Sequence, residues 1–162
     1  MTKQETYDLL RSRGAEFEIT DHAAVYNMEE CAALELPYPE DDAKNLFVRD
    51  DKHRDYYLIT VRGDKRVDLK QFRRDNGTRP LTFASPDELM HFTGLTPGSV
   101  TPLGLLEDED RAVHFYIDED FLTPPGRIGV HPNDNTATIW LRTEDLLALI
   151  REHGNPVSTV KL

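Results

Sequence analysis

Short segments rich in β-branched and aromatic residues mark the strands that this chain is expected to form. Residues 46–48 (Leu-Phe-Val) and 56–61 (Tyr-Tyr-Leu-Ile-Thr-Val) have this composition, and the polar run 49–55 joins them, which predicts a β-hairpin. Phe17 and Ile19 alternate with polar residues, as in a half-buried strand. Three further strand candidates cover residues 114–117, 127–130 and 137–140.

Capping residues and glycines mark the ends of the expected helices. Thr2 and Glu5 have the spacing of a capping box, and Ser85 has the same spacing to Glu88, with a proline directly after the cap. A glycine or a proline then closes each segment. The predicted helices run from Thr2 to Gly14, from Asn27 to just before Pro37, from Asp68 to Gly77, from Ser85 to Gly94 and from Thr143 to Gly154.

The order of these elements indicates the fold class. Strands that follow one another in short-loop pairs, with helices between the groups, favour an α+β fold with a mainly antiparallel sheet. A chain of 162 residues is expected to form a single domain, residues 1–162, that buries roughly 70% of its unfolded surface. Neither GxGxxG nor GxxxxGK followed by Ser or Thr occurs, so a nucleotide-binding fold is not expected.

The charge balance limits how this chain could contact nucleic acid. Its net charge is −11, so the surface as a whole repels a long phosphate backbone, and any RNA contact should be local. A DNA-binding regulator is not expected, because no helix-turn-helix or zinc motif accompanies the charge. One basic segment could contact an RNA end, although a solvated face explains it equally well. It contains Arg62, Lys65, Arg66, Lys70, Arg73, Arg74 and Arg79.

Composition also bears on the compartment. No apolar run approaches the ~20 residues that span a membrane, and the N-terminus has no apolar signal core. Cys31 is the only cysteine, so no internal disulfide can form. These features fit a cytoplasmic protein.

Two segments could carry chemistry. Lys44-Asn45 directly precedes the apolar strand 46–48, where a cation and an amide could reach into a cleft, although a surface lysine is the commoner explanation. The stretch 94–104 contains three glycines and two prolines and should form a tightly turned loop. Within it, the N–H groups of Gly98, Ser99 and Val100 could bind one developing oxyanion, or the loop could be a structural turn.

Other catalytic groups are harder to find. His131 ends a strand candidate and could bind substrate or transfer a proton, although a lone histidine is more often structural. No His, Cys, Asp and Glu spacing matches a zinc site, and no serine or cysteine lies in a nucleophile motif. We therefore expect no metal and no cofactor, and a hydrolase of this kind would form no covalent enzyme intermediate.

Taken together and in this order, the motifs resemble the YbaK/prolyl-tRNA synthetase-associated editing domains, over about residues 3 to 153. Within that family the chain looks most similar to free-standing proteins that deacylate alanyl-tRNA for proline. The matching segments are Glu29-Glu30, Lys44-Asn45-Leu46-Phe47, Tyr57-Leu58, Asp68-Leu69-Lys70, Leu81-Thr82-Phe83-Ala84-Ser85, Thr93-Gly94, Pro97-Gly98-Ser99-Val100-Thr101-Pro102-Leu103-Gly104 and His131-Pro132-Asn133.

The resemblance implies a fold and a reaction. It implies a central, largely antiparallel and partly barrel-like sheet wrapped by helices. It implies that Lys44 holds the acylated 3′ end of the tRNA and that the loop from Gly98 to Pro102 grips the aminoacyl ester through its main chain. A water would attack the ester, helped by the 2′-hydroxyl of the terminal adenosine. Some family members act on cysteinyl-tRNA or on other small residues, so the acyl group stays open.

Selectivity for a small acyl group has a physical basis. A synthetase pocket shaped for proline also admits alanine, because missing methylenes cost only about 1–3 kcal/mol of discrimination, so a second, smaller sieve is needed. We expect Asn45, Ser99, Val100, Pro102 and His131 to bind substrate, and Ile19, Val25, Met28 and Leu34 to line the acyl pocket. The acceptor end of proline tRNA would be the main partner, contacted by Arg62, Lys65, Arg66 and Lys70, with prolyl-tRNA synthetase or an elongation factor as transient partners. A non-catalytic module that binds a tRNA end or a protein is the alternative.

Overall fold

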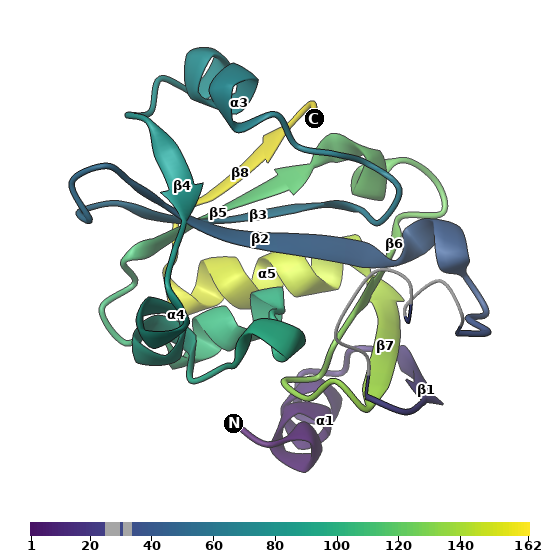
Figure 1. Cartoon of the computed structure of the whole chain (residues 1–162). Coiled ribbons are helices and arrows are strands. Elements are labelled where there is room, and N and C mark those ends of the chain that lie inside the picture. Colours follow the sequence, from purple (N-terminus) through teal and green to yellow (C-terminus); the bar gives the residue numbers. More distant parts are fainter. Residues whose placement is uncertain (25–29, 31–33) are drawn as a thin grey trace.

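A five-stranded mixed sheet forms the centre of the molecule. The computed structural model describes residues 1–24, 30 and 34–162. The strand order is β4 (Leu81–Phe83), β2 (Ala43–Asp50), β3 (Tyr56–Arg62), β5 (Val113–Asp118) and β8 (Val157–Val160). The first three strands are antiparallel, which confirms the predicted hairpin, whereas β3, β5 and β8 run parallel (Figure 1).

A smaller antiparallel sheet lies beside the first. Its order is β1 (Phe17–Asp21), β7 (Ala137–Arg142) and β6 (Arg127–Val130). One isolated parallel bridge, between Asp42 and Gly129, joins the two sheets where β2 begins. The α+β class is confirmed, but neither sheet closes into a barrel, because the strands divide between two sheets that this single bridge joins within the described residues.

The helices begin and end where the capping residues predict. Within the described residues, the helices of eight or more residues are α1 (Lys3–Ser12), α3 (Leu69–Asn76), α4 (Pro86–Thr93) and α5 (Thr143–His153). Thr2 and Ser85 form complete capping boxes, and Gly77, Gly94 and Gly154 end their helices in the left-handed conformation. The expected helix from Asn27 to just before Pro37 lies partly outside the described residues, at 27–29 and 31–33. Of the rest, Glu30 is helical and residues 34–36 are not. No helix in the described part of the chain has both the length and the apolar composition needed to cross a bilayer.

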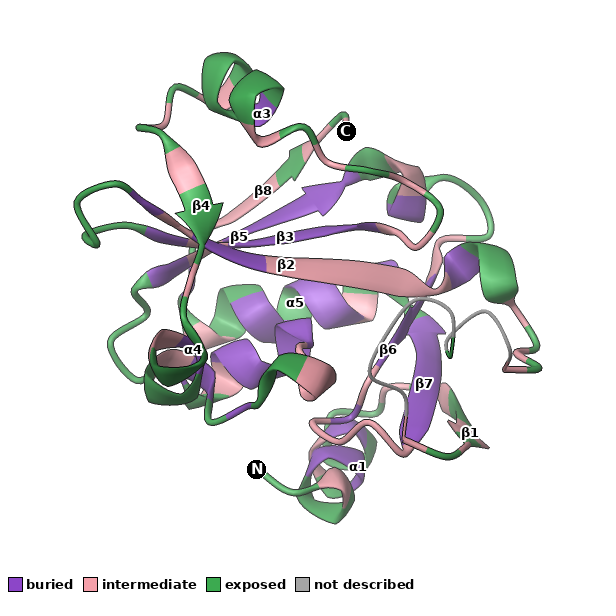
Figure 2. Cartoon of the chain, viewed as in Figure 1, coloured by how far each residue is buried: buried purple, intermediate pink, exposed green. Residues whose placement is uncertain are grey.

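Helices cover the two faces of the large sheet unequally. Helix α3 lies on one face, where Phe72 packs with Val48, Ile59 and Tyr116 in a small apolar cluster. Helices α4 and α5 lie on the other face and enclose the larger core, together with the 3-10 helix η3 (Pro102–Glu107). Burial on both faces explains why β3 and β5 read as continuous apolar runs (Figure 2).

The first half of β2 is less buried than its second half. Residues 43–46 are half-buried, and Phe47 and Val48 are fully buried (Figure 2). Lys44 and Asn45 therefore lie inside the strand, which begins at Ala43 rather than at the predicted Leu46. The open end of β2 adjoins the bridge to β6, so the two sheets meet next to the residues expected to carry chemistry.

Candidate functional site

The glycine- and proline-rich loop is built from two short 3-10 helices, η2 (Pro97–Ser99) and η3. The side chain of Thr101 accepts a hydrogen bond from the Leu103 N–H at 3.4 Å and its carbonyl accepts from the Gly104 N–H at 3.1 Å, so this buried threonine fixes the bend. The Ser99 N–H donates to the Thr96 carbonyl at 2.9 Å. Because this amide is already used within the turn, the predicted trio of oxyanion donors loses its middle member.

Two other residues of the loop, Pro102 and Gly104, are packed more tightly against the rest of the protein than the sequence indicates. Pro102 is buried, so its ring anchors the loop in the core. Gly104 lies against Leu95, and a methyl group added at Gly104 would lie 2.5 Å from a Leu95 methyl carbon. Gly98, by contrast, is half-buried in η2, which leaves it at the edge of the loop.

Asn45 connects β2 to this loop. Its side-chain nitrogen donates to the Val100 carbonyl at 3.4 Å, and its side-chain oxygen accepts from the Thr60 hydroxyl at 2.6 Å. Thr60 is fully buried and lies opposite Asn45 in the β2–β3 register, so the neighbouring strand orients the amide. The structure thus brings together Asn45 and Val100, two of the residues predicted to bind substrate.

An apolar recess of about 330 Å³ lies next to this contact. Asn45 and Phe47 line it from β2, and Pro97 and Val100 line it from the loop. Phe83, Ala84, Ser85, Pro86 and Leu89 complete the lining from β4 and the start of α4. The recess offers a mostly apolar surface with one amide at its edge.

Lys44 does not face the loop. Side chains alternate along a strand, and Asn45 and Phe47 face the larger core, whereas Leu46 packs in the small cluster under α3. Lys44 is on the same side as Leu46, and its ammonium group donates to the Lys65 carbonyl. Burial, followed by the nearby Arg66, lowers the pKa of Lys44. The expected meeting of Lys44 with the Gly98–Pro102 loop is therefore not present, because one residue of offset places the two neighbours on opposite faces.

His131 lies at the end of β6, close to a second histidine. Its Nδ1 is 2.9 Å from the Ala137 carbonyl, which can only accept, so Nδ1 carries the hydrogen and Nε2 of the neutral ring is an acceptor. Burial lowers the pKa of His131, and the hydrogen bond to the Ala137 carbonyl only partly opposes this effect. The two ring centroids are 6.1 Å apart. His131 is thus a neutral acceptor near pH 7, a state suited to binding or proton transfer.

Of the four residues predicted to line the acyl pocket, Ile19 and Leu34 are described, and Leu34 is half-buried. Met28 and Val25 lie outside the described residues. Ile19 is 39% exposed, although it pairs with the buried Ile139 in the β1–β7 register. An exposed isoleucine above the small sheet fits a pocket wall, and its role stays a prediction.

The predicted tRNA-contacting residues fall into two groups. The Lys65 ammonium lies 2.6 Å from Asp118 Oδ2 and 2.5 Å from Asp120 Oδ2, and Arg62 donates to the Asp120 carbonyl at 3.3 Å. These contacts hold both side chains against η4 (Glu119–Leu122), so Lys65 is not available to a phosphate. Arg66 and Lys70 are exposed and form no ion pair in the described part of the chain.

Asp42 is a titratable group that sequence reasoning missed. It directly precedes β2 at the bridge to Gly129, and burial raises its pKa to about 6. Its sequence context, an acidic loop, gave no signal, because only the junction of the two sheets buries it. Within residues 1–24, 30 and 34–162 no group of three His, Cys, Asp or Glu side chains could hold a metal ion.

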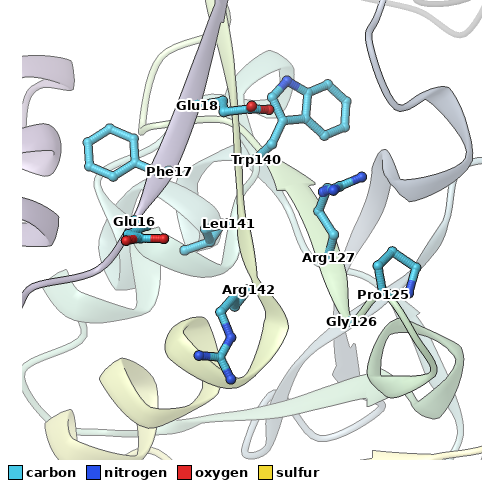
Figure 3. Close-up of a pocket in the computed structure, with 9 residues that line it drawn as sticks. All are labelled: Glu16, Phe17, Glu18, Pro125, Gly126, Arg127, Trp140, Leu141 and Arg142. Atoms are coloured by element: carbon cyan, nitrogen blue, oxygen red, sulfur yellow. The ribbon is translucent and has the colours of Figure 1, made fainter.

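A second recess, of about 250 Å³, lies over the outer face of the small sheet (Figure 3). Its lining includes Trp140 and Arg127, and the Arg127 guanidinium stacks 3.7 Å from the centre of the Tyr38 ring. Trp140 packs edge-on against Tyr38, with ring centroids 5.5 Å apart. None of the residues predicted for the site lines this recess, so we assign it to packing of the small sheet.

Comparisons with known proteins identify the family of this chain. Residues 22–149 match the model of the aminoacyl-tRNA editing domain. The prolyl-tRNA editing protein ProX of Acetoanaerobium sticklandii is 36% identical over 148 residues, which cover 90% of this chain and 88% of that protein. The prolyl-tRNA synthetase associated domain-containing protein 1 of Mus musculus is 30% identical over 141 residues, covering 85% and 83% of the two chains.

A solved structure shares the fold over almost its whole length. It is that of a proposed trans-editing enzyme for prolyl tRNA synthetase, with a TM-score of 0.68 and 25% identity over 99% of this chain and 96% of that one. The family model covers most of the chain, and the relatives align along nearly all of it. The chain therefore belongs to the aminoacyl-tRNA editing domain family.

Proposed function

We propose that this protein removes alanine from wrongly charged proline tRNA, acting in trans on the released aminoacyl-tRNA. Membership of the family makes the chain an aminoacyl-tRNA hydrolase. Its similarity to the prolyl-tRNA editing protein ProX supports proline tRNA as the tRNA class. The choice of alanine rests on the motif resemblance and on the size argument, and it is the part that experiment must settle.

The contact between Asn45 and the Gly98–Pro102 loop is the observation that carries the proposal. It fixes a main-chain loop next to a strand end and an apolar recess. In such an arrangement the Gly98 amide can stabilise the charge that develops on the ester carbonyl oxygen, and one such donor contributes about 2.7–4 kcal/mol. An aminoacyl ester is already activated, so this assistance and a positioned water can suffice.

The reaction we propose needs no covalent enzyme intermediate. The oxygen of a water bonds to the ester carbonyl carbon, and the bond from that carbon to the ribose oxygen breaks. The water's proton passes to the ribose oxygen, with the adjacent ribose hydroxyl as relay, and free alanine leaves. Neutral His131, with Nε2 as acceptor, is suited to hold the amino group or the water.

A deacylation panel tests this function. Purified protein is mixed with proline tRNA charged with alanine, cysteine, serine or proline, and the loss of each ester is followed with time. We expect alanyl-tRNA to be hydrolysed fastest and prolyl-tRNA to stay intact, because the proline ring does not fit the sieve. Hydrolysis of all four aminoacyl-tRNAs would show that the protein is a general esterase without a size sieve. Equal binding of charged and uncharged tRNA without turnover would instead identify a binding module.

Partners follow from the same proposal. The acceptor end of proline tRNA is the substrate, and no cofactor is needed. Prolyl-tRNA synthetase and an elongation factor hold the same tRNA before and after this step, so we include brief contact with either in the proposal.

An Arg151→Gln variant, altered at an exposed position of α5, serves as the control in the deacylation panel.

A further inference from the structure

Four exposed cations lie together on α3 and on the segment that leads into it. They are Arg66, Lys70, Arg73 and Arg74. None of their side chains makes an ion pair or hydrogen bond within the described residues. The chain as a whole carries 30 acidic residues against 19 Lys and Arg, so an unbalanced positive area is unusual for this surface.

The spacing of these residues places three of them on one flank of the helix. Lys70 is three residues before Arg73 and four before Arg74, so the three side chains are neighbours on the helix surface. Like charges at this spacing destabilise a helix by about 0.2–0.5 kcal/mol per pair. The opposite flank carries Gln71 and Asp75, which hydrogen-bond to each other at 2.8 Å. The helix thus separates its charges instead of pairing them.

Other cations of the same basic segment are neutralised by acids. Lys65 is held by Asp118 and Asp120, and Arg79 forms an ion pair with Asp51 at 2.7 Å. Asp68, which is next to the helix, uses its side chain to cap the N–H groups of Lys70 and Gln71. No acidic side chain of the described residues neutralises Lys70, Arg73 and Arg74, so this flank is available to bind an anion outside the chain.

The cationic flank connects with the candidate site along one face of the sheet. Helix α3 covers one face of the large sheet (Figure 1), and the alternation of side chains along β2 places Lys44 on that face together with Leu46. The Lys44 ammonium is bonded to the Lys65 carbonyl, and Arg66 lies close enough to affect its pKa. Positive charge thus continues from α3 through Arg66 to Lys44, where β2 also carries Asn45 on its other face.

We infer that the flank formed by Lys70, Arg73 and Arg74, with Arg66, binds the phosphate backbone of the tRNA acceptor stem. The inference rests on the proposed function, because it takes the tRNA end to the site at β2. A polyanion is the partner that matches several unpaired cations on one helix flank. The stem would lie across α3, and the 3′ end would pass Lys44 to reach the loop.

The cationic flank is short, as expected for a protein whose surface is otherwise acidic. An eight-residue helix is about 12 Å long, which spans only a few phosphates of one strand. A contact of this size brings a stem to the site without requiring a basic surface elsewhere. The tRNA-contacting residues that we infer are therefore Arg66, Lys70, Arg73 and Arg74. Arg62 and Lys65, which the sequence analysis included, are not among them.

The test compares two substrates and two double variants. Arg73→Gln with Arg74→Gln removes two charges from the flank, and Arg142→Gln with Arg151→Gln removes two exposed charges at the start and near the end of α5. We expect the α3 variant to lose at least fivefold in kcat/KM on alanyl-tRNA for proline at low salt. It should match wild type on 3′-alanyl-adenosine 5′-phosphate, which has no stem. The α5 variant should match wild type on both.

A binding measurement separates this inference from the proposed function. Affinity for uncharged proline tRNA is measured against salt, where each lost phosphate contact lowers the slope of log K on log salt by about 0.9. We expect a decrease of about 1.8 for the α3 variant and none for the α5 variant. An unchanged slope, or an equal loss on both substrates, would overturn the inference, whether or not alanine proves to be the acyl group.

Discussion

Replacing Asn45 with alanine tests the contact on which the proposed function rests. The substitution removes the donor to the Val100 carbonyl and also the acceptor of the Thr60 hydroxyl. Thr60 is fully buried, so its hydroxyl would lose its partner away from water. Asn45→Ala therefore has two effects, one on the loop and one on the fold, and the structure provides a way to separate them.

The two effects have different sizes. A buried hydroxyl left without a partner costs about 1–3 kcal/mol of the free energy of unfolding. The bond to Val100, at 3.4 Å, is long and contributes less to stability. In the double variant Asn45→Ala with Thr60→Val both polar partners are gone, so most of the lost stability should return. The loop stays untethered, and kcat/KM should stay at least tenfold low, which corresponds to about 1.4 kcal/mol.

Urea unfolding and alanyl-tRNA deacylation are measured on wild type, Asn45→Ala, Thr60→Val and the double variant. The expected pattern is that stability recovers in the double variant and activity does not. Thr60→Val alone keeps the amide but removes its orienting hydroxyl, and it should lose less activity than Asn45→Ala. If activity recovers together with stability in the double variant, Asn45 supports only the fold, and the site reasoning is refuted.

Three further predictions concern stability. Gly129→Ala would place a methyl group 2.3 Å from the Trp140 ring, so urea unfolding should show a loss of about 1–3 kcal/mol, and a neutral result would mean that the indole can move. Burial alone would raise the pKa of Glu88, but hydrogen bonds, first from Tyr56, lower it to about 2. Glu88→Gln should thus cost at most about 3 kcal/mol above the unfolded pKa near 4.5, and the difference from wild type should shrink as pH falls from 4.5 towards 2. Asp42 has its pKa raised to about 6, so its carboxylate is unfavourable in the folded state at pH 7. Asp42→Asn should raise stability at pH 7, with a gain that disappears as pH falls from 6 to 4, and a pH-independent gain would contradict this assignment.

The sequence predicts the local elements well because their signals are local. Capping boxes at Thr2 and Ser85 and left-handed glycines fix the helix ends within a residue or two. The polar run between two apolar strands gives the hairpin of β2 and β3. These features depend on neighbours in the chain, so no knowledge of the fold is needed to find them.

Pairings between distant segments are not visible in the same way. Strands β4 and β8 are edge strands of only three and four residues, so their β-branched and aromatic residues are too few to form a pattern that predicts a strand. The parallel pairing of β5 with β3 and β8 requires long crossovers, so the sheet is more mixed than the hairpin pattern suggests. The division into two sheets, in place of a partial barrel, has the same origin.

The sequence does not show which polar groups of the site are already bonded to other parts of the protein. The basic segment looks uniform in sequence, yet acids from β5 and η4 neutralise Lys65 and leave Lys70 exposed. The loop amides look equivalent, yet the turn uses that of Ser99. Burial of Pro102 likewise follows from the packing of η3. Each difference arises from a contact between segments far apart in the chain.

The resemblance assigns Lys44 the role of holding the acylated 3′ end of the tRNA, and the alternation of side chains along β2 limits which part of that end it can reach. Asn45 faces the loop, so Lys44, one residue earlier, faces α3 and Arg66. A substrate held by the loop at its ester would bring the phosphate of its terminal nucleotide towards the other face of the strand. We therefore predict that Lys44 holds this phosphate and does not touch the ester carbonyl.

The prediction separates two substrates that differ by one group. Lys44→Ala should lower kcat/KM at least tenfold on 3′-alanyl-adenosine 5′-phosphate, about 1.4 kcal/mol for a lost charge-assisted contact. On 3′-alanyl-adenosine without the phosphate it should match wild type, and Lys44→Arg should keep part of the activity on the phosphorylated substrate. The side chain is half-buried at a strand edge, so unfolding should change little. An equal loss on both substrates would mean that the lysine leaves the Lys65 carbonyl and reaches around β2 to the ester, and the strand geometry would then describe only the unbound protein.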